Sequence, residues 1–411
     1  MRVRFRSTQG RRSAEHKGHA RLGFSISSAI LPFVIYFDHN ATTAVLPEVR
    51  EAMMPYLGDE WGNPSSTYRF GSHLKSKIEQ AREQVAKLIG CETPREIIFT
   101  SGGTESNNAA IHAAIESQPR THIVTSMVEH SSVLSYFRFL ADYRGYLLTC
   151  LPVDKDGLIS LDELKENLGP NTAIVSLMWA NNETGVLFPI EQIADICRSH
   201  DVPFHCDAVQ AAGRLPIDVR SLPIDYLSLS GHKLGTPKGV GALYVRKKAP
   251  FVPFIHGGHQ ERGNRGGTEN VASLVGLGIA AAHALKKLPQ YDGIVRPLRD
   301  ALEHGILTSI PQTELNGHAI QRLANTTNIT FHGIESEALL LMLDQAGICA
   351  SSGSACLADS PDPSHVIAAM KPGDAARQCV RFSLSTETDL DQVNITVQRL
   401  RALIQTLSGI R

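Results

Sequence analysis

The chain has 411 residues, more than one typical hydrophobic core holds, so two or three domains are expected. A hydrophobic content of 42% and a charged content of 20% are ordinary for a globular protein, and they exclude a disordered chain, a collagen and a coiled-coil rod. Because 40 Lys and Arg residues face 41 Asp and Glu residues, the net charge is −1 and gives no electrostatic reason to expect nucleic-acid or membrane binding.

The first 33 residues differ from the rest of the chain. Residues 1–25 carry seven basic side chains against one acid, Glu15. We expect a disordered extension here, with an organelle transit peptide as the alternative, and folded sequence from about Val34. No stretch of the sequence reaches the roughly 18 apolar residues that a membrane span needs. We therefore expect a cytoplasmic protein.

From about residue 45 to 245 the sequence alternates between two kinds of hydrophobic pattern. Apolar residues spaced by three and four predict helices, whereas short runs rich in Val, Ile and Phe predict buried strands. Such strand–helix alternation predicts an α/β domain with a mostly parallel sheet. The helices are expected at 71–89, 104–116, 130–142 and 190–199, and the strands at Glu96–Thr100, His122–Ser126, Ala173–Met178, Pro203–Cys206, Tyr226–Ser230 and Gly241–Val245.

The pattern changes toward the C-terminus. A long helical stretch at 271–308 is followed by a strand-like run at Asn328–Phe331 and a helix at Ser336–Ala346. A final helix is expected with one apolar face, formed by Leu390, Val393, Val397, Leu400 and Ile404. This part predicts a smaller α+β unit packed closely against the first.

A glycine-rich turn, Ser101-Gly102-Gly103-Thr104-Glu105-Ser106, follows one predicted strand and opens a helix. Glycines allow a ligand to approach the backbone, and the helix N-terminus favours an anion such as phosphate. Such a turn is also common without any ligand. The sequence lacks the dinucleotide and P-loop forms of this motif.

Two side chains follow neighbouring strands of the predicted sheet. Asp207 ends one apolar run, where ligands of open α/β sheets bind. Lys233 follows the next run within Ser230-Gly231-His232-Lys233. Alone, Asp207 is equally typical of a helix N-cap, and an isolated lysine is usually solvated. Together they favour a pyridoxal phosphate site, in which a lysine bonds the cofactor aldehyde and an aspartate keeps the pyridine ring protonated.

With these residues in place, the chain resembles the cysteine desulfurases of the NifS/IscS group, in the class V aminotransferase family of fold-type I pyridoxal-phosphate enzymes. The resemblance extends from about residue 35 to 400 in the family's order, and it is closest to the NifS branch. Its segments are Tyr36–Thr43, Thr100–Asn107, Val128–His130, Trp179–Gly185, His205–Gln210, Ser230–Lys233, Gly257–Asn270 and Ala350–Cys356.

The resemblance implies two domains. Residues 48–285 would form the large cofactor-binding domain with a mostly parallel seven-stranded sheet. Residues 34–47 and 286–411 would form the small α+β domain that carries the catalytic cysteine.

The resemblance also implies roles for individual residues in binding pyridoxal 5'-phosphate. Lys233 would bond the cofactor, Asp207 would pair with its ring nitrogen and Gln210 with its ring hydroxyl. His130 would stack on the ring and exchange protons with the substrate. Asn182 and Arg381 would bind the substrate carboxylate. The phosphate would be held by Gly103, Thr104, Ser230 and His232, and by Thr268 from the other subunit of a homodimer.

The seven cysteines form no CxxC pair, which argues against a disulfide framework and a structural metal site and fits a reducing compartment. The resemblance makes Cys356 the persulfide-forming nucleophile, and residues 357–364 match the longer loop of the NifS/IscS group. A thiol that attacks bound substrate and then presents sulfur to a partner needs a mobile, polar loop. The other cysteines are expected to be bystanders: Cys91, Cys150, Cys197, Cys206, Cys349 and Cys379.

Three features depart from the family pattern. Leu357 stands where the family commonly has threonine, and Met370–Val380 is about one residue short, which affects the placing of Arg381. The N-terminal extension lies outside the pattern.

The resemblance implies conversion of L-cysteine to L-alanine, with sulfur passed from Cys356 to an iron–sulfur scaffold or another acceptor protein. Supply of sulfur for nitrogenase and general cluster assembly both remain open. The alternatives are a selenocysteine lyase, an aminotransferase of the same fold and, in another class, a non-enzymatic scaffold.

Overall fold

The computed structural model describes residues 34–352 and 363–409. The expectations about residues 1–33 and about Cys356 lie outside these ranges and stay predictions.

A seven-stranded sheet forms the centre of the first core, as the sequence analysis expected. Its strand order is β2-β8-β7-β6-β5-β3-β4, and only β8 runs antiparallel to its neighbours, β2 and β7. The strands β3 to β7 pair in parallel. Their bounds are β2 (Ile97–Thr100), β3 (His122–Ser126), β4 (Leu147–Leu151), β5 (Thr172–Met178), β6 (Phe204–Asp207), β7 (Tyr226–Ser230) and β8 (Gly241–Val245).

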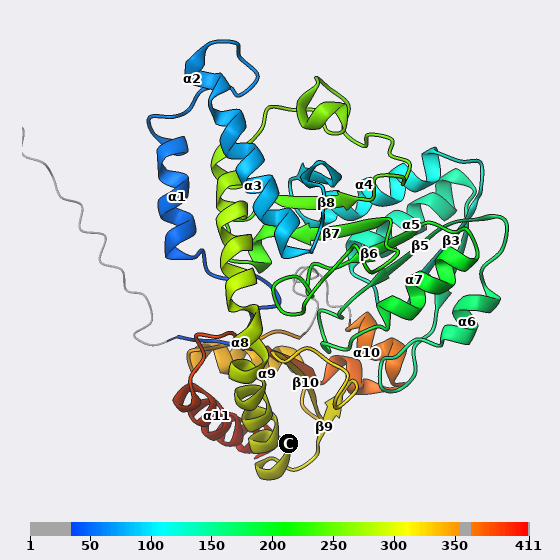
Figure 1. Ribbon diagram of the computed structural model, residues 1–411. Coiled ribbons are helices and arrows are strands. Elements are labelled where there is room, and N and C mark those ends of the chain that lie inside the picture. Colours follow the sequence, from blue (N-terminus) through cyan, green and yellow to red (C-terminus); the bar gives the residue numbers. More distant parts are fainter. Residues whose placement is uncertain (1–33, 353–362, 410–411) are drawn as a thin grey trace, which may run out of the picture. The chain divides into compact units, whose positions relative to one another are not determined.

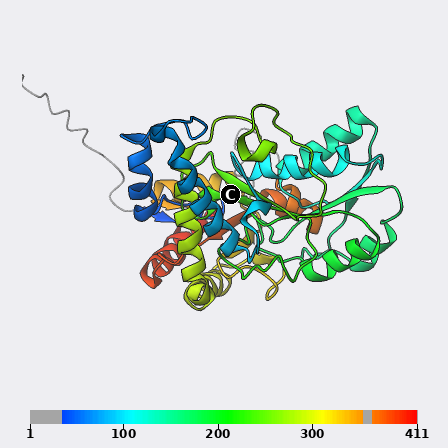
Figure 2. The same cartoon turned by 45° about the horizontal axis from the view of Figure 1, so that its top comes forward.

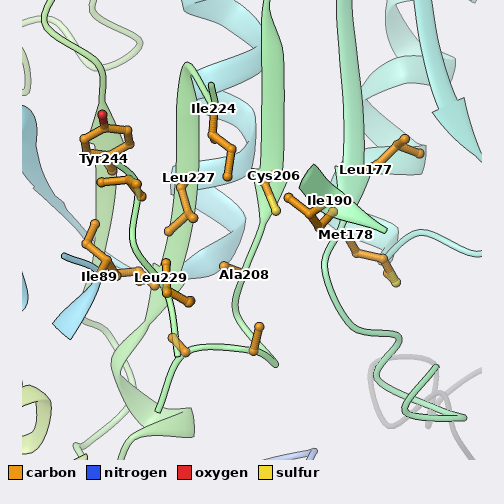
Figure 3. Close-up of a cluster of buried hydrophobic side chains, with 14 of the residues drawn as sticks. Ile89, Leu177, Met178, Ile190, Cys206, Ala208, Ile224, Leu227, Leu229 and Tyr244 are labelled. Carbon is orange, nitrogen blue, oxygen red and sulfur yellow. The ribbon is translucent and has the colours of Figure 1, made fainter. Parts of the chain in front are cut away.

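Helices cover both faces of this sheet (Figure 1). On one face, α4 (Gly103–Glu116) and α5 (Ser131–Arg144) pack against side chains such as Tyr226. On the other, α3 (Leu74–Leu88) and α7 (Ile190–Ser199) pack against side chains such as Leu227. Figure 3 shows part of this second layer, in which Leu227, Leu229 and Cys206 point to the same side of their strands. Burial on both faces explains why these strands appear in the sequence as continuous apolar runs.

A second hydrophobic core is formed by the C-terminal part of the chain together with Ile35 and Phe37. Its antiparallel sheet has the order β12-β10-β9, and β1 pairs in parallel with β11 nearby. The strands are β1 (Ile35–Tyr36), β9 (Thr313–Asn316), β10 (Thr326–Phe331), β11 (Ile348–Cys349) and β12 (Cys379–Ser383), and the helices are α9 (Ser336–Gln345) and α11 (Leu390–Gly409). The expected apolar face of α11 is wrong at its start, because Leu390 is 54% exposed whereas Val393, Leu400 and Ile404 are buried.

The long helix α8 (Val271–Ser309) belongs to both cores. Its first turns contribute Leu274 and Leu277 to the first core, and its last turns contribute Leu302 and Ile306 to the second. It packs along α3 and α1 (Pro47–Leu57), and the three helices lie side by side in both views (Figures 1 and 2). The proposed boundary near residue 285 therefore falls within one continuous helix, and the two domains remain a prediction.

By length and hydropathy alone, α8 is also the one candidate membrane span among the described helices. Half of its apolar window is buried inside the protein. Because the core helix of a globular protein has the same properties, we interpret α8 as such a helix.

The remaining elements are short. They are α2 (Arg69–Ser72), α6 (Leu161–Glu166), α10 (His365–Met370) and the 3-10 turns η1 (Pro94–Glu96), η2 (Gly231–Lys233), η3 (Gln260–Gly263) and η5 (Asp374–Arg377). Although α10 lies in the C-terminal part of the sequence, its Val366 and Ile367 pack into the first core. This packing brings the segment that follows residue 362 against the large sheet.

A buried ion pair connects α3, η3 and β2. Arg82 donates from Nη1 to Glu261 Oε2 at 2.6 Å and from Nη2 to Oε1 at 2.8 Å, and the amide of Phe99 donates to Oε2 at 2.9 Å. We expect Glu261→Ala to lower the free energy of unfolding by about 3 kcal/mol, because it leaves the buried Arg82 guanidinium with only the half-exposed carboxylate of Glu79 as an ionic partner. Urea denaturation followed by circular dichroism measures this change.

The matched control is Asp195→Ala, which breaks an exposed pair with Arg198 on α7. Exposed pairs of this kind contribute about 1 kcal/mol or less. Equal losses in the two variants would contradict the role given to the buried pair.

Candidate active site

Ten of the residues predicted for the site line one cavity of about 190 Å³ at the carboxyl ends of β5, β6 and β7. They come from six separate parts of the sequence, which the fold brings together. They are Gly103, Thr104, His130, Asn182, Asp207, Gln210, Ser230, His232, Lys233 and Arg381. Thr268 lines a different cavity, beside Gly267 and Arg265, and Cys356 is not among the described residues.

Asp207 is the last residue of β6 and is 6% exposed. Its Oδ1 accepts a hydrogen bond from the amide of Val209 at 3.0 Å, and its Oδ2 accepts one from Asn107 Nδ2 at 2.7 Å. No helix begins at Asp207, because the next element of the chain is the strand β7. The helix N-cap alternative is therefore wrong, and Asp207 instead presents a buried carboxylate to the cavity.

Lys233 lies at the end of η2, directly after β7. Its Nζ donates to the backbone carbonyls of Asn40 and Ala41, the second at 2.7 Å. These carbonyls belong to the segment after β1, which also lines the cavity. The alternative of a solvated lysine is therefore wrong, because the amine is held against the cavity wall.

The glycine-rich turn forms the wall next to Ser230. Gly102 has φ +154°, and a Cβ on Gly103 would lie 2.9 Å from the Val209 side chain. Only glycine permits this close approach. No side-chain hydrogen bond caps the N-terminus of α4, and its first residues, Gly103 and Thr104, line the cavity together with Ser230 and His232. Burial, with the charges of Lys233 and Lys238, lowers the pKa of His232 to about 4, so its imidazole is neutral near pH 7.

His130 is both a helix-start residue and a cavity residue. It is the N-cap of α5, where its Nδ1 accepts a hydrogen bond from the amide of Ser132 at 3.1 Å. The same side chain lines the cavity. His130 is therefore a helix-start residue and a site residue at once, because the hydrogen bond that caps α5 also orients a ring that lines the cavity.

Arg381 lies in β12 and is 1% exposed, so it is not a surface charge. Its Nη2 pairs with Asp38 Oδ1 at 2.5 Å, and its Nη1 donates to the carbonyl of Asn182 at 3.0 Å. The guanidinium therefore connects the segment after β1 with the Asn182 loop at the cavity. Although Met370–Val380 is about one residue shorter than the family pattern, Arg381 still lies at the cavity.

Several cavity residues were missed by the sequence analysis. Glu183 is buried beside Asn182, and its Oε2 accepts a hydrogen bond from Ser364 Oγ at 2.5 Å. Burial raises the pKa of this carboxyl. His365 also lines the cavity, and its Nε2 lies 3.0 Å from the carbonyl of Glu129. The Trp179–Gly185 segment was singled out, but nothing in the sequence indicates that α10 returns to meet it.

The described cysteines are poor nucleophiles. Burial raises the pKa of Cys91 and of Cys379 to about 12, and it raises the pKa of Cys150, Cys197, Cys206 and Cys349 as well. A thiol held in its protonated form reacts slowly. Cys379 lies near the site, with Sγ 3.6 Å from the carbonyl of Ser352, but its burial favours a packing role.

Glu129 is a fully buried carboxyl next to His130. Its Oε1 accepts hydrogen bonds from Ser126 Oγ at 2.8 Å and from the Met178 amide at 3.0 Å, while its Oε2 has no partner among the described residues. Burial, opposed by these two hydrogen bonds and assisted by the charge of Asp207, raises the pKa of Glu129 to about 8.

This raised pKa predicts a pH-dependent stability. In the unfolded chain Glu129 ionises above about pH 4.5, whereas in the folded protein it keeps its proton up to about pH 8. Its contribution to stability therefore falls as the pH rises from 4.5 and levels off above 8. Glu129→Gln should remove this decline. The free energy of unfolding of the variant, minus that of the wild type, should therefore be larger at pH 8 than at pH 5. Urea denaturation at several pH values measures the difference.

The control is Glu166→Gln on the exposed surface of α6, which should keep the wild-type pH dependence. A decline in Glu129→Gln equal to that of the wild type would contradict this account of Glu129.

No group of three or more His, Cys, Asp or Glu side chains within the described ranges is arranged to hold a metal ion.

Comparison with known proteins assigns the family. The model of the class-V aminotransferases matches residues 35–395. A cysteine desulfurase from Trichormus azollae is 51% identical over 379 residues, which cover 90% of this chain and 94% of that protein. The cysteine desulfurase NifS of Azotobacter vinelandii is 47% identical over 378 residues, which cover 92% of this chain and 94% of that protein.

Solved structures agree with these relatives. A NifS-like protein superposes with a TM-score of 0.85 at 34% identity, covering 91% of this chain and all of the other. SspA in complex with cysteine superposes with a TM-score of 0.76 at 37% identity, covering 86% of this chain and all of the other. The chain therefore belongs to the aminotransferase class-V family, and within that family to the cysteine desulfurases. The expected fold and family are confirmed.

Proposed function

We propose that the chain binds pyridoxal 5'-phosphate in this cavity and converts L-cysteine to L-alanine there, with the sulfur captured on Cys356. The observation that carries the proposal is the meeting of Asp207, Lys233 and the N-terminus of α4 around one cavity. These groups match the three chemical demands of the cofactor: a partner for its ring nitrogen, an amine for its aldehyde and a wall of donors for its phosphate.

The residues present fit this cofactor. Position 103 accepts only glycine, because a Cβ there would lie 2.9 Å from the Val209 side chain, and the helix that begins at this turn has no side-chain cap. We assign the phosphate to this wall, formed by Gly103, Thr104, Ser230 and His232, with Thr268 of a second subunit completing it in a homodimer. Asp207 would hold the ring nitrogen, and Gln210 Nε2, which already donates to the Asn40 carbonyl at 3.0 Å, would hold the ring hydroxyl.

The bound cofactor supplies an electron sink that stabilises negative charge at the substrate Cα. The chain's own residues supply position and proton transfer. Arg381 and Asn182 would orient the substrate carboxylate, which a guanidinium can hold with two hydrogen bonds. Lys233 Nζ would take the Cα proton, and His130 would exchange protons with the substrate near the ring.

Cys356 would supply the nucleophile that removes the sulfur. Its thiolate attacks the substrate sulfur, the bond between that sulfur and Cβ breaks, and a persulfide forms on Cys356. The remaining three-carbon fragment takes up protons and leaves as L-alanine. Ser351, five residues earlier, has its carbonyl bonded to the amide of the cavity residue Arg381 at 2.7 Å. Five residues of extended chain span up to about 17 Å, which supports delivery of Cys356 to the cavity.

The sulfur acceptor belongs to the proposal as well. An iron–sulfur scaffold or another acceptor protein would take the persulfide sulfur, and nitrogenase maturation is one such use because of the similarity to NifS. We also propose that the protein acts as a homodimer in the cytoplasm.

The test is the product analysis of the purified protein with L-cysteine and a thiol reductant. We expect sulfide and L-alanine in equal amounts, together with visible absorption from a lysine-bound cofactor. Formation of a keto acid in place of alanine would instead indicate an aminotransferase. Turnover of L-selenocysteine without turnover of L-cysteine would indicate a selenocysteine lyase, and failure to take up the cofactor would contradict the whole proposal.

A further inference from the structure

A chain of hydrogen bonds runs along the wall of the cavity from Asp207 to His130. Asn107 Nδ2 lies 2.7 Å from Asp207 Oδ2 and 2.9 Å from Ser132 Oγ, and Ser132 Oγ lies 2.8 Å from His130 Nδ1. Asn107 and Ser132 are both buried, on α4 and α5. The sequence motifs assign no role to either residue.

The direction of these bonds follows from Asp207. A carboxylate only accepts hydrogen bonds, so the Asn107 atom 2.7 Å away must be the amide nitrogen. The reverse orientation would place two oxygens at that distance. The two hydrogens of this nitrogen then serve Asp207 Oδ2 and Ser132 Oγ. Ser132 Oγ is therefore an acceptor toward Asn107, and its own proton is available for His130.

His130 Nδ1 consequently faces two donors. Ser132 donates to it from Oγ at 2.8 Å and from the backbone amide at 3.1 Å. A backbone amide can never accept, so an Nδ1 that carried a proton would lose this partner. The imidazole must therefore keep Nδ1 unprotonated and carry its proton on Nε2.

We propose that Asn107 and Ser132 are positioning residues that connect Asp207 to His130 and hold the His130 ring in the tautomer with its proton on Nε2. This inference deepens the proposed function, because it assigns the protonated nitrogen of the side chain proposed to exchange protons with the substrate. Asp207 sets the orientation of the Asn107 amide. Because Asn107 then donates to Ser132 Oγ, the Ser132 hydroxyl donates its own proton to His130 Nδ1.

The first test reads the tautomer directly. Protein labelled with ¹⁵N in histidine is studied as the holoenzyme by solid-state NMR, and His130→Gln identifies the His130 signals by their loss. We expect an unprotonated Nδ1 and a protonated Nε2 in the wild type. A protonated Nδ1 in the neutral ring would overturn the proposal. This result does not depend on desulfurase activity, so a protein that makes no sulfide would refute the proposed function and leave the tautomer testable.

The second test compares variants by the pH dependence of kcat. The charged or titratable groups that line the cavity with His130 are the same in every variant: Glu183, Asp207, His232, Lys233, His365 and Arg381. Ser132→Ala removes the hydroxyl donor but keeps the amide, so protonation of Nδ1 becomes easier. The loss of one hydrogen bond should move the acid limb of the profile up by about half to one pH unit.

Ser132→Thr keeps a hydroxyl and should restore the wild-type profile. Ser135→Ala, one turn further along α5 and exposed, is the matched control and should leave the profile unchanged. A uniform loss of activity in Ser132→Ala with an unmoved acid limb and an unchanged NMR spectrum would mean that Ser132 only packs, and would overturn the proposal. The same shift in Ser135→Ala would overturn it as well.

Discussion

Lys233→Ala should reduce the formation of L-alanine from L-cysteine by at least about 10²-fold, since proton transfer by a positioned side chain contributes roughly 10²–10⁴-fold in rate. The amine is held at the cavity wall by the carbonyls of Asn40 and Ala41, and no other lysine among the described residues lines the cavity. The same variant should lose the visible absorption of the lysine-bound cofactor. Spectra and alanine assays on purified protein measure both effects.

Lys238→Ala is the control for Lys233. Lys238 is an exposed lysine in the same stretch of chain, and its loss should leave spectrum and rate close to those of the wild type. Full activity of Lys233→Ala, or an unchanged spectrum, would refute the assignment of Lys233.

Cys356→Ala is expected to separate cofactor binding from sulfur transfer. The variant keeps Asp207 and Lys233, so it should retain the visible absorption of the wild type. It lacks the thiolate that accepts the sulfur, so sulfide production should fall to background. Cofactor absorption and sulfide release, measured on one preparation, show whether the two functions separate.

The matched control is Cys150→Ala on β4, at the edge of the sheet, where burial raises the thiol pKa. We expect it to produce sulfide at the wild-type rate. If Cys356→Ala produced sulfide normally, the persulfide would have to form elsewhere, or the enzyme would release sulfur directly as a selenocysteine lyase can.

Much of the large sheet could be predicted because its strands are buried on both faces. Six of its seven strands appear in the sequence as continuous apolar runs, and α7 was placed at its observed bounds. The strand β4 was missed because it lies at the sheet edge, where Leu147 is 64% exposed and the run is only half-buried. The start of α11 was wrongly predicted to be buried. The apolar spacing of the helix includes Leu390, but this side chain is exposed and packs into neither core.

The sequence predicts those site residues that stand at the carboxyl end of a predicted strand. Asp207 ends β6 and Lys233 follows its parallel neighbour β7, so their meeting is a consequence of sheet topology. The links through Asn107 and Ser132 could not be predicted in this way. Asn107 contacts Asp207 across 100 residues of sequence, and only the packing of α4 and α5 on the sheet shows that these side chains meet.

The most direct test of the account is a single turnover of the wild type with L-cysteine and no reductant, followed by mass spectrometry of the cysteine-containing peptides. The account predicts one added sulfur atom on the Cys356 peptide and one L-alanine per active site. Added sulfur on another cysteine, or alanine formed without any persulfide on Cys356, would contradict it.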